Sequence, residues 1–236
     1  MPTSDFESLA SRYDAWYTTP VGAWADRLES EVIFQLLALQ PGERLLDLGT
    51  GTGRYAVEAA ARGAWVTGVD ASPAMLSVAR ERVRASRQPI RLVRADLARL
   101  PFPDGSFDAA VAVTSLCFVA DPLAVLREAR RVLRPGGRLV LGELNRWSIW
   151  AALRRLKGLV RPTVFRAARF HSIRELHALL RSVGFAVCEW HGLLHLPPVN
   201  SVSFLRVLDP LERLGQRSTP WCGAFLAVAA SPVKGP

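Results

Sequence analysis

The feature that most constrains the fold is a short apolar run that leads into a glycine-rich loop. The residues are Leu46-Asp-Leu-Gly-Thr-Gly-Thr-Gly53, with glycine at positions 49, 51 and 53. Glycine is favoured in such a loop because a side chain would block close approach and because some turn positions require a positive φ. The residues that follow, 56–62, predict a helix start. A strand, a glycine turn and a helix N-terminus form a pocket in which backbone N–H groups are expected to point at a ligand.

Downstream of this loop, strands and helices alternate regularly. Alternation with helices of this length is typical of parallel βαβ units and predicts a doubly wound α/β sheet. Strands are expected at 44–48, 64–69, 90–95, 107–113, 138–142, 185–190 and 222–230. Helices between the first five strands are expected at 53–62, 72–86 and 121–133.

The regions on either side of this core are less regular. Two helices, 4–17 and 22–39, are expected before the first strand, and further helices at 172–183 and 202–214. Residues 146–170 combine aromatic side chains with arginines and contain no acid. This segment follows strand five at the edge where ligands bind in such sheets, which favours a lid. A surface for anionic lipid, a patch for an acidic substrate and an ordinary packed helix stay open.

Size and composition are those of one domain. The 236 residues are divided into a helical cap (1–40), a core (41–145), the lid segment (146–170) and a C-terminal half of the sheet (171–236). The net charge of +9 fits anionic partners, but the chain has no dense basic run, so nucleic acid is disfavoured as a partner. The cysteines lack metal-ligand spacing and are expected to be buried thiols, and no metal is expected. Without a signal peptide or a membrane-length apolar run, a cytoplasmic protein is expected, either monomer or homodimer.

Three acids follow three consecutive predicted strands. Asp47, Asp70 and Asp96 are therefore expected at one edge of the sheet, where Asp70 suits the two hydroxyls of a ribose. A nicotinamide dinucleotide stays open on the glycines and Asp70 alone. That fingerprint, however, requires a small residue at the position of Arg54. Asp47 would repel a pyrophosphate but would accept a hydrogen bond from an ammonium group, so a cofactor with an amino-acid tail is favoured.

These motifs resemble those of a known family. The matching segments are the glycine loop, Gly68-Val-Asp70, Asp96-Leu97 with Leu100-Pro-Phe102, Phe107-Asp108 and Leu133-Arg-Pro-Gly-Gly137. In this order they resemble the class I S-adenosylmethionine-dependent methyltransferases. The small-molecule branch with the ubiquinone and menaquinone C-methyltransferases (methyltransferase type 11) is the most similar. The resemblance implies a seven-stranded, mostly parallel Rossmann-like sheet with the last strand antiparallel.

The resemblance also implies a set of cofactor-binding residues for S-adenosylmethionine and its product S-adenosylhomocysteine. The methionine part would contact the glycine loop, the adenosine part the ends of the second and third strands, and Tyr13 would close the site. The full set is Tyr13, Asp47, Gly49, Thr50, Gly51, Gly53, Asp70, Ala71, Met75, Asp96, Leu97 and Thr114.

The methyl acceptor is much less constrained by the sequence. We expect a small, apolar or aromatic molecule, with Tyr17, Asn145 and Trp147 on the substrate side. A base is needed only if the acceptor must lose a proton. The candidates for such a base are His191 and His195, together with Asp14, Glu143 and Asn145. A module that binds the cofactor or a partner without turnover is the alternative.

Overall fold

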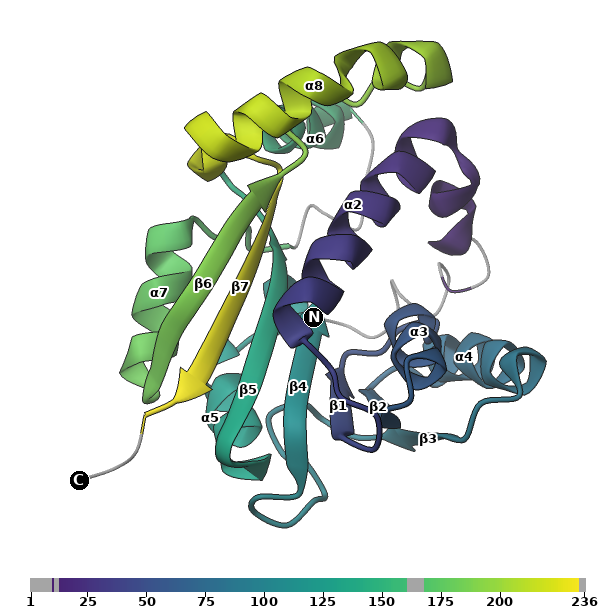
Figure 1. Ribbon diagram of the computed structural model, residues 1–236, viewed down its shortest axis with the longest axis vertical. Coiled ribbons are helices and arrows are strands. Elements are labelled where there is room, and N and C mark those ends of the chain that lie inside the picture. Colours follow the sequence, from purple (N-terminus) through teal and green to yellow (C-terminus); the bar gives the residue numbers. More distant parts are fainter. Residues whose placement is uncertain (1–9, 11–12, 161–167, 234–236) are drawn as a thin grey trace.

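The computed structural model describes residues 10, 13–160 and 168–233. Its described strands form one seven-stranded sheet of order β3-β2-β1-β4-β5-β7-β6. β1 to β5 pair in parallel, whereas β7 runs antiparallel to both β5 and β6. The predicted sheet, including its antiparallel last strand, is confirmed (Figure 1).

The strands have the following bounds: β1 (Arg44–Leu48), β2 (Trp65–Asp70), β3 (Ile90–Arg94), β4 (Phe107–Val113), β5 (Leu133–Leu144), β6 (Phe185–Leu193) and β7 (Phe225–Pro232). The longer helices are α2 (Pro20–Leu37), α3 (Arg54–Ala61), α4 (Pro73–Ser86), α5 (Pro122–Val132), α6 (Ile149–Val160), α7 (Ile173–Ser182) and α8 (Val202–Ser218). The 3₁₀ turns are η1 (Asp14–Thr18), η2 (Leu116–Phe118) and η4 (Pro220–Cys222).

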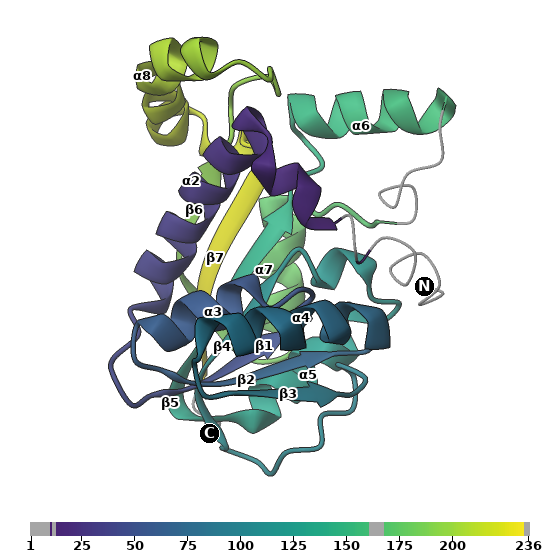
Figure 2. The ribbon, with the colours of Figure 1, turned by 90° about the vertical axis from the view of Figure 1, so that its right-hand side faces the viewer.

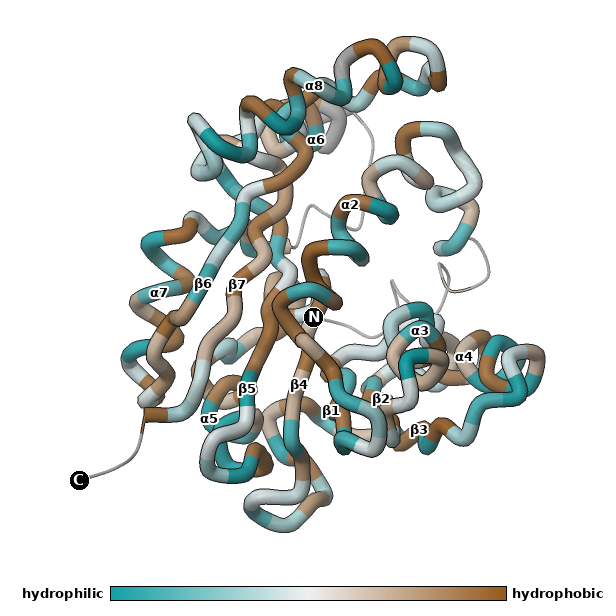
Figure 3. The backbone as a smooth tube through the Cα atoms, in the orientation of Figure 1, coloured by the Kyte–Doolittle hydropathy of each residue, from teal (hydrophilic) through white to brown (hydrophobic). Residues whose placement is uncertain are grey.

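Alternate residues of the strands supply two separate cores, because successive side chains of a strand point to opposite faces. One core packs α2 and α3 against one face, where Leu45 and Val111 lie. The other packs α5 and α7 against the opposite face, where Leu46 and Leu141 lie (Figure 1). The central strands accordingly show apolar colours in Figure 3. Figure 2 shows α3 and α4 side by side on the face that α2 also covers.

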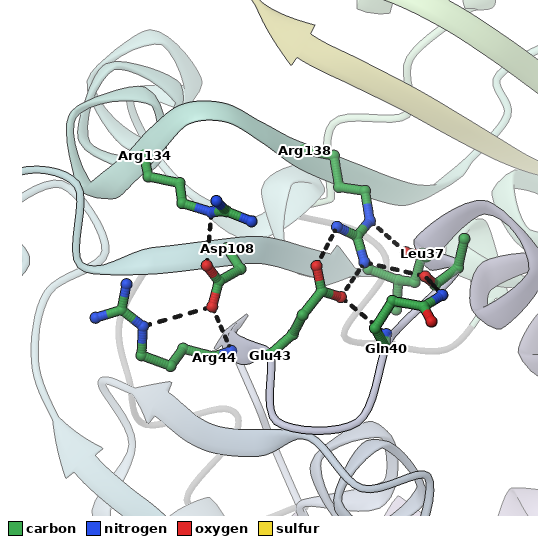
Figure 4. A network of polar contacts seen from close by, with 8 residues as sticks. Leu37, Gln40, Glu43, Arg44, Asp108, Arg134 and Arg138 are labelled. Carbon is green, nitrogen blue, oxygen red and sulfur yellow. Dashed lines mark hydrogen bonds and ion pairs between the residues drawn. The ribbon is translucent and has the colours of Figure 1, made fainter.

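A polar network holds the C-terminal end of α2 against the sheet (Figure 4). Arg138 of β5 donates to the carbonyl of Leu37, one of the groups that a helix end leaves unsatisfied. The same guanidinium donates to Glu43 at 2.6 and 3.0 Å, and Glu43 accepts from the Gln40 amide at 2.9 Å. α2 is therefore fixed over the β5 half of the sheet, and this matters for the site described below.

Several predicted boundaries shift for identifiable reasons. α2 begins at Pro20, because the Thr19 hydroxyl accepts from the amide of Gly22 and caps the helix. The segment 222–224 is not strand, because Pro220–Cys222 forms a turn before β7. Of the predicted helix 4–17, residues 1–9 and 11–12 lie outside the described residues, and 14–18 form the 3₁₀ turn η1.

Other expectations about the chain can be compared with the described residues. Cys117 is buried as predicted, but Cys188 and Cys222 are exposed, so the prediction of three buried thiols is wrong. Within the described ranges, no group of three metal-ligating side chains is found. Among the described helices, none combines the length and apolar character needed to cross a bilayer.

Candidate functional site

A cavity of about 390 Å³ lies at the carboxyl ends of β1, β2 and β4, beside the segment that follows β3. Every residue predicted to bind the cofactor lines it, except Gly53. Its walls also include residues from η1, α2 and α3 that the cofactor motifs do not contain. The described lining residues outside the predicted cofactor set are Tyr17, Glu29, Thr52, Arg54, Tyr55, Ser72, Val113, Ser115, Phe118, Val119 and Ala120.

The backbone of the glycine loop differs from the expected N–H cradle. The amides of Gly49 and Thr50 donate to the carbonyl of Val69, at 2.8 and 2.9 Å. The amide of Gly51 donates to Asp70 at 2.9 Å, and that of Gly53 to Thr50 at 2.9 Å. These four donors are used within the protein, so the prediction that they point at a ligand is wrong. A loop whose backbone N–H groups are already paired has few donors for a phosphate, so it disfavours the pyrophosphate of a dinucleotide.

Glycine is required at two positions of the loop, 49 and 53, for different structural reasons. A Cβ on Gly49 would lie 2.5 Å from the Cβ of Ser115, and its φ is +74°, so the position excludes a side chain. A Cβ on Gly53, at φ +79°, would lie 3.2 Å from the Cβ of Ala79 on α4. Gly53 therefore permits close packing of α3 on α4 rather than lining the cavity.

Thr114, at the end of β4, also has an unusual backbone. Its φ is +49°, a region that β-branched residues rarely adopt. Its amide donates to the carbonyl of Gly142 at 2.6 Å, which holds the turn in place. Such strain tends to occur at functional sites, because the surrounding structure must maintain it. Thr114 lines the cavity, where the family resemblance also places it.

Asp47 is a buried acid with one hydrogen-bond donor beside it. Its side chain is 2% exposed and accepts from the hydroxyl of Thr50 at 2.6 Å. Burial raises the pKa of Asp47 to about 7, the Thr50 hydrogen bond opposes the rise, and the charge of Asp70 adds to it. An ammonium group placed next to this carboxyl would stabilise its ionised form. Asp47 therefore suits a ligand with a cationic amino group.

Asp70 and Asp96 present carboxylates to the cavity. The two oxygens of Asp70 accept from the amides of Gly51 and Ser72, each at 2.9 Å. A carboxylate only accepts hydrogen bonds, so it is the kind of group to which ribose hydroxyls donate. Asp96 accepts from the amide of Ala98 at 2.9 Å and is otherwise exposed at the mouth of the cavity.

The wall opposite the strand ends contains groups that the motifs do not reveal. Glu29 of α2 lines the cavity together with Tyr13, Tyr17 and Tyr55. Glu29 lies between Ala25 and Ile33, both buried on α2, at the four-residue spacing that places side chains on one helix face. An acid within the buried stripe of an amphipathic helix is the signal that could have identified it.

Arg54, whose size argued against a dinucleotide, also belongs to this wall. Its guanidinium forms an ion pair with Asp26 of α2 and lies 3.9 Å from the centre of the Tyr17 ring. Arg54 thereby connects the first turn of α3 to α2 and η1. The Arg54 side chain therefore helps to close this wall of the cavity.

The structure places the two histidines proposed as weak base candidates away from the cavity. His191 lies on β6, where its Nε2 contacts Glu189 at 2.7 Å on an exposed surface. His195 contacts the buried Glu212 and the carbonyl of Thr219, at 3.2 and 3.0 Å, so its role is structural. Neither is among the described lining residues, and the prediction of either as a base is wrong.

Asp14 and Glu143 are also committed elsewhere. Asp14 accepts from Thr52 at 3.0 Å and from Arg82 at 2.6 Å, which ties η1 to the glycine loop and α4. Glu143 is fully buried and accepts from the amide of Leu116 at 3.0 Å. Neither belongs to the described lining of the cavity.

Of the three residues expected on the substrate side, only Tyr17 lines the cavity. Asn145 is buried, and its amide donates to the carbonyls of Trp221 and Gly223, both at 2.7 Å. Trp147 is 66% exposed at the start of the lid segment. The prediction is wrong for these two, because a side chain beyond strand five can turn toward β7 or toward solvent.

Taken together, the residues that line the cavity fit S-adenosylmethionine. Its ammonium group matches the buried Asp47, its ribose matches Asp70, and it has no phosphate that would need free loop amides. Gly49 lets the loop pack closely against Ser115, and both residues line the cavity. A nicotinamide dinucleotide fits these residues poorly, because its pyrophosphate would meet Asp47.

Comparisons with known proteins agree with this fit. A family model described as a methyltransferase domain matches residues 46–141. A protein of Mycobacterium tuberculosis is 36% identical over 189 residues, 80% of this chain and 62% of that protein. A demethylmenaquinone methyltransferase of Mycobacterium sp. is 42% identical over 142 residues, 60% of this chain and 59% of that enzyme. The chain thus spans about 60% of the length of the curated relatives it matches.

A solved structure extends the similarity to nearly the whole fold. It is a methyltransferase of Thermotoga maritima, described as a "possible histamine N-methyltransferase", with 28% identity and a TM-score of 0.72. The match covers 97% of this chain and 99% of that one. With the sheet order and the cavity described above, these findings show that the chain belongs to the class I S-adenosylmethionine-dependent methyltransferases and that its cofactor is S-adenosylmethionine.

Proposed function

We propose that this chain transfers a methyl group from S-adenosylmethionine to a small apolar or aromatic acceptor. The observation that carries the proposal is a single cavity with two unlike walls. One wall holds the acids at the ends of β1 and β2 and after β3. The other holds aromatic side chains of η1 and α3, at the end of the cavity where an acceptor would lie beside the cofactor.

On the cofactor side, the proposed roles are those that the family resemblance implies, given to residues that line the cavity. Asp47 would accept from the ammonium group and Asp70 from the ribose hydroxyls. Ala71 and Met75 would pack on the adenosine, and Asp96 with the Leu97 backbone would meet the adenine edge. The sulfonium of the bound cofactor supplies an electrophilic methyl carbon. The protein must therefore orient the acceptor and exclude water.

The lid segment is placed to help with that exclusion. Trp150 of α6 donates from Nε1 to the carbonyl of Leu196 at 2.6 Å, and its ring lies edge-on to Trp16 at 6.2 Å. Arg154, one turn further along α6, carries a positive charge that opposes the rise in the pKa of Glu29 in the cavity wall. We infer that the segment 146–170 acts as a lid, and this inference rests on its described residues, 146–160 and 168–170.

A transfer assay with methyl-labelled S-adenosylmethionine tests the function. The acceptor panel should include demethylmenaquinone and histamine, which the names of two similar proteins suggest. We expect a labelled product from an apolar or aromatic acceptor, with equimolar S-adenosylhomocysteine. If the cofactor binds but no acceptor in a broad metabolite extract gains label, the chain is a binding module without turnover, and the proposal is wrong.

A further inference from the structure

The chain contains three tyrosines, and all three line the same cavity. Tyr13 and Tyr17 belong to the η1 region and Tyr55 to α3, and Glu29 of α2 lines the cavity with them. The rings of Tyr13 and Tyr17 lie 6.2 Å apart, and Tyr55 stacks on Phe34 at 6.0 Å. The hydroxyl of Tyr55 is buried and has no hydrogen-bond partner among the described residues. Such an unpaired hydroxyl indicates that a polar group of a ligand completes the site.

Glu29 is positioned away from Asp70 and Asp96. α2 packs on β5 and β7, whereas Asp70 lies at the end of β2 and Asp96 just after β3, in the other half of the sheet. The network of Arg138 and Glu43 fixes α2 in this place. Glu29 therefore belongs to the acceptor end of the cavity.

Glu29 makes no hydrogen bond or ion pair with the residues that the structure describes. The charged groups that face it are Asp26 on α2, Arg54 on α3 and Arg154 on α6. Tyr13, Tyr17 and Tyr55 face it from η1 and α3. Arg54 is already engaged by Asp26 and by the Tyr17 ring. The Glu29 carboxyl lines the cavity and makes no hydrogen bond or ion pair within the described structure, so it is available to a ligand.

The other ionisable groups of this wall cannot serve as bases near neutral pH. Burial raises the pKa of Tyr13 to about 12 and raises that of Tyr17 and Tyr55 further above the ordinary value. Burial, with Asp26 adding and both arginines opposing, raises the pKa of Glu29 to about 8. A general base works best when its pKa lies near the working pH.

We propose that Glu29 is the proton acceptor of the methyl transfer and that the acceptor is an aromatic molecule methylated on a phenolic hydroxyl. This inference rests on the function proposed above. The phenol oxygen forms the new bond to the methyl carbon, and the bond from that carbon to sulfur breaks with its electron pair left on sulfur. The phenolic proton moves to the carboxylate of Glu29 and is later released to solvent. The neutral tyrosine hydroxyls can hydrogen-bond the acceptor oxygen.

Phenols are the class of methyl acceptor that fits the wall formed by Glu29 and the tyrosines. An unperturbed phenol has a pKa of about 10, close enough to that of Glu29 for a direct proton transfer. An aliphatic alcohol is far less acidic than a phenol. The aromatic walls supplied by the tyrosines and Phe118 match a planar ring.

Phenols of different acidity test the proposal, with Glu29→Gln as the variant. Glutamine keeps the shape but cannot accept the proton. For unsubstituted phenol, kcat/KM should fall by about 100-fold or more, the usual contribution of a general base. For 4-nitrophenol, which is already largely ionised at pH 8, the fall should be much smaller. The wild-type pH profile should show an ionisation near 8 that the variant lacks.

Glu31→Gln is the matched control, because Glu31 lies on the same helix with its side chain 67% exposed. It should change kcat/KM by less than about twofold. Glu29→Gln should also bind S-adenosylhomocysteine within about twofold of wild type, because Glu29 lies outside the cofactor end. Equal losses with both phenols would assign Glu29 a structural role and overturn the proposal.

Two further outcomes separate this inference from the function it rests on. If another class of acceptor is methylated but neither phenol yields a methyl ether, the phenol inference fails and the methyltransferase function stands. If no acceptor of any class is methylated, both fail.

Discussion

Asp70→Ala is expected to weaken the binding of S-adenosylhomocysteine by about 1–3 kcal/mol, the cost of a lost charge-assisted hydrogen bond. This corresponds to about 5- to 150-fold in Kd. Asp70 accepts from the amides of Gly51 and Ser72 and lines the cavity at the end of β2. The substitution therefore removes a ligand contact and leaves two loop amides without their acceptor. Isothermal calorimetry on protein stripped of ligand measures the effect.

Asp104→Ala provides the control for the loss of one negative charge. Asp104 lies on the surface with its side chain 81% exposed, paired with Arg131 at 2.8 Å. Its replacement should change the affinity for S-adenosylhomocysteine by less than about twofold. An Asp70→Ala protein that is folded and binds with unchanged affinity would mean that the ribose lies elsewhere.

Glu212→Ala is expected to lower the free energy of unfolding by about 2–4 kcal/mol. Glu212 is 1% exposed and accepts from the amides of Leu194, His195 and Leu196, at 2.8, 2.7 and 3.3 Å. It also accepts from the side chain of Gln216 at 3.1 Å. Its loss would leave these donors of the 194–196 segment, beneath α8, without their acceptor. Urea denaturation followed by fluorescence gives the change.

The pH dependence of this effect has a definite sign. Burial alone would raise the pKa of Glu212, but hydrogen bonds from His195 and Gln216 outweigh it and hold the pKa below its ordinary value. The contribution of Glu212 to stability is therefore fully present above the unfolded pKa, about 4.3, and is lost as the pH falls through the folded pKa. The difference between wild type and Glu212→Ala should be large at pH 7 and shrink in acid.

Glu189→Ala is a suitable comparison, because Glu189 also contacts a histidine, His191, but on an exposed surface. Surface pairs contribute at most about 1 kcal/mol, so this variant should be nearly as stable as wild type. Equal destabilisation by the two substitutions would contradict the structural role given to Glu212.

The sequence predicted the fold and the grouping of three acids in one cavity, because both depend on local patterns. Alternating strands and helices lead to parallel pairing, and parallel pairing brings Asp47, Asp70 and Asp96 to one edge. Short-range motifs therefore predicted a long-range arrangement. The same reasoning failed for the loop amides, because hydrogen bonds to Val69 and Asp70 depend on the neighbouring strand.

The acceptor end could not be predicted in this way. Histidine often serves as a base, and for that reason the sequence suggests His191 and His195. In the structure, His191 lies on the antiparallel strand β6 and His195 contacts the buried Glu212, so both lie away from the cavity. The apolar pattern of α2 predicts the helix and its buried face but does not single out Glu29, an acid within that face. Its role depends on how α2, η1 and α3 pack together, and no local motif records that packing.

The most direct test of the account is a calorimetric titration of the ligand-stripped wild-type protein with S-adenosylhomocysteine. The account predicts saturable binding of one ligand per chain, with S-adenosylmethionine competing for the same site and a nicotinamide dinucleotide giving no competition. Absence of binding heat at several temperatures, together with no shift in the melting temperature, would contradict the assignment of the cavity to this cofactor.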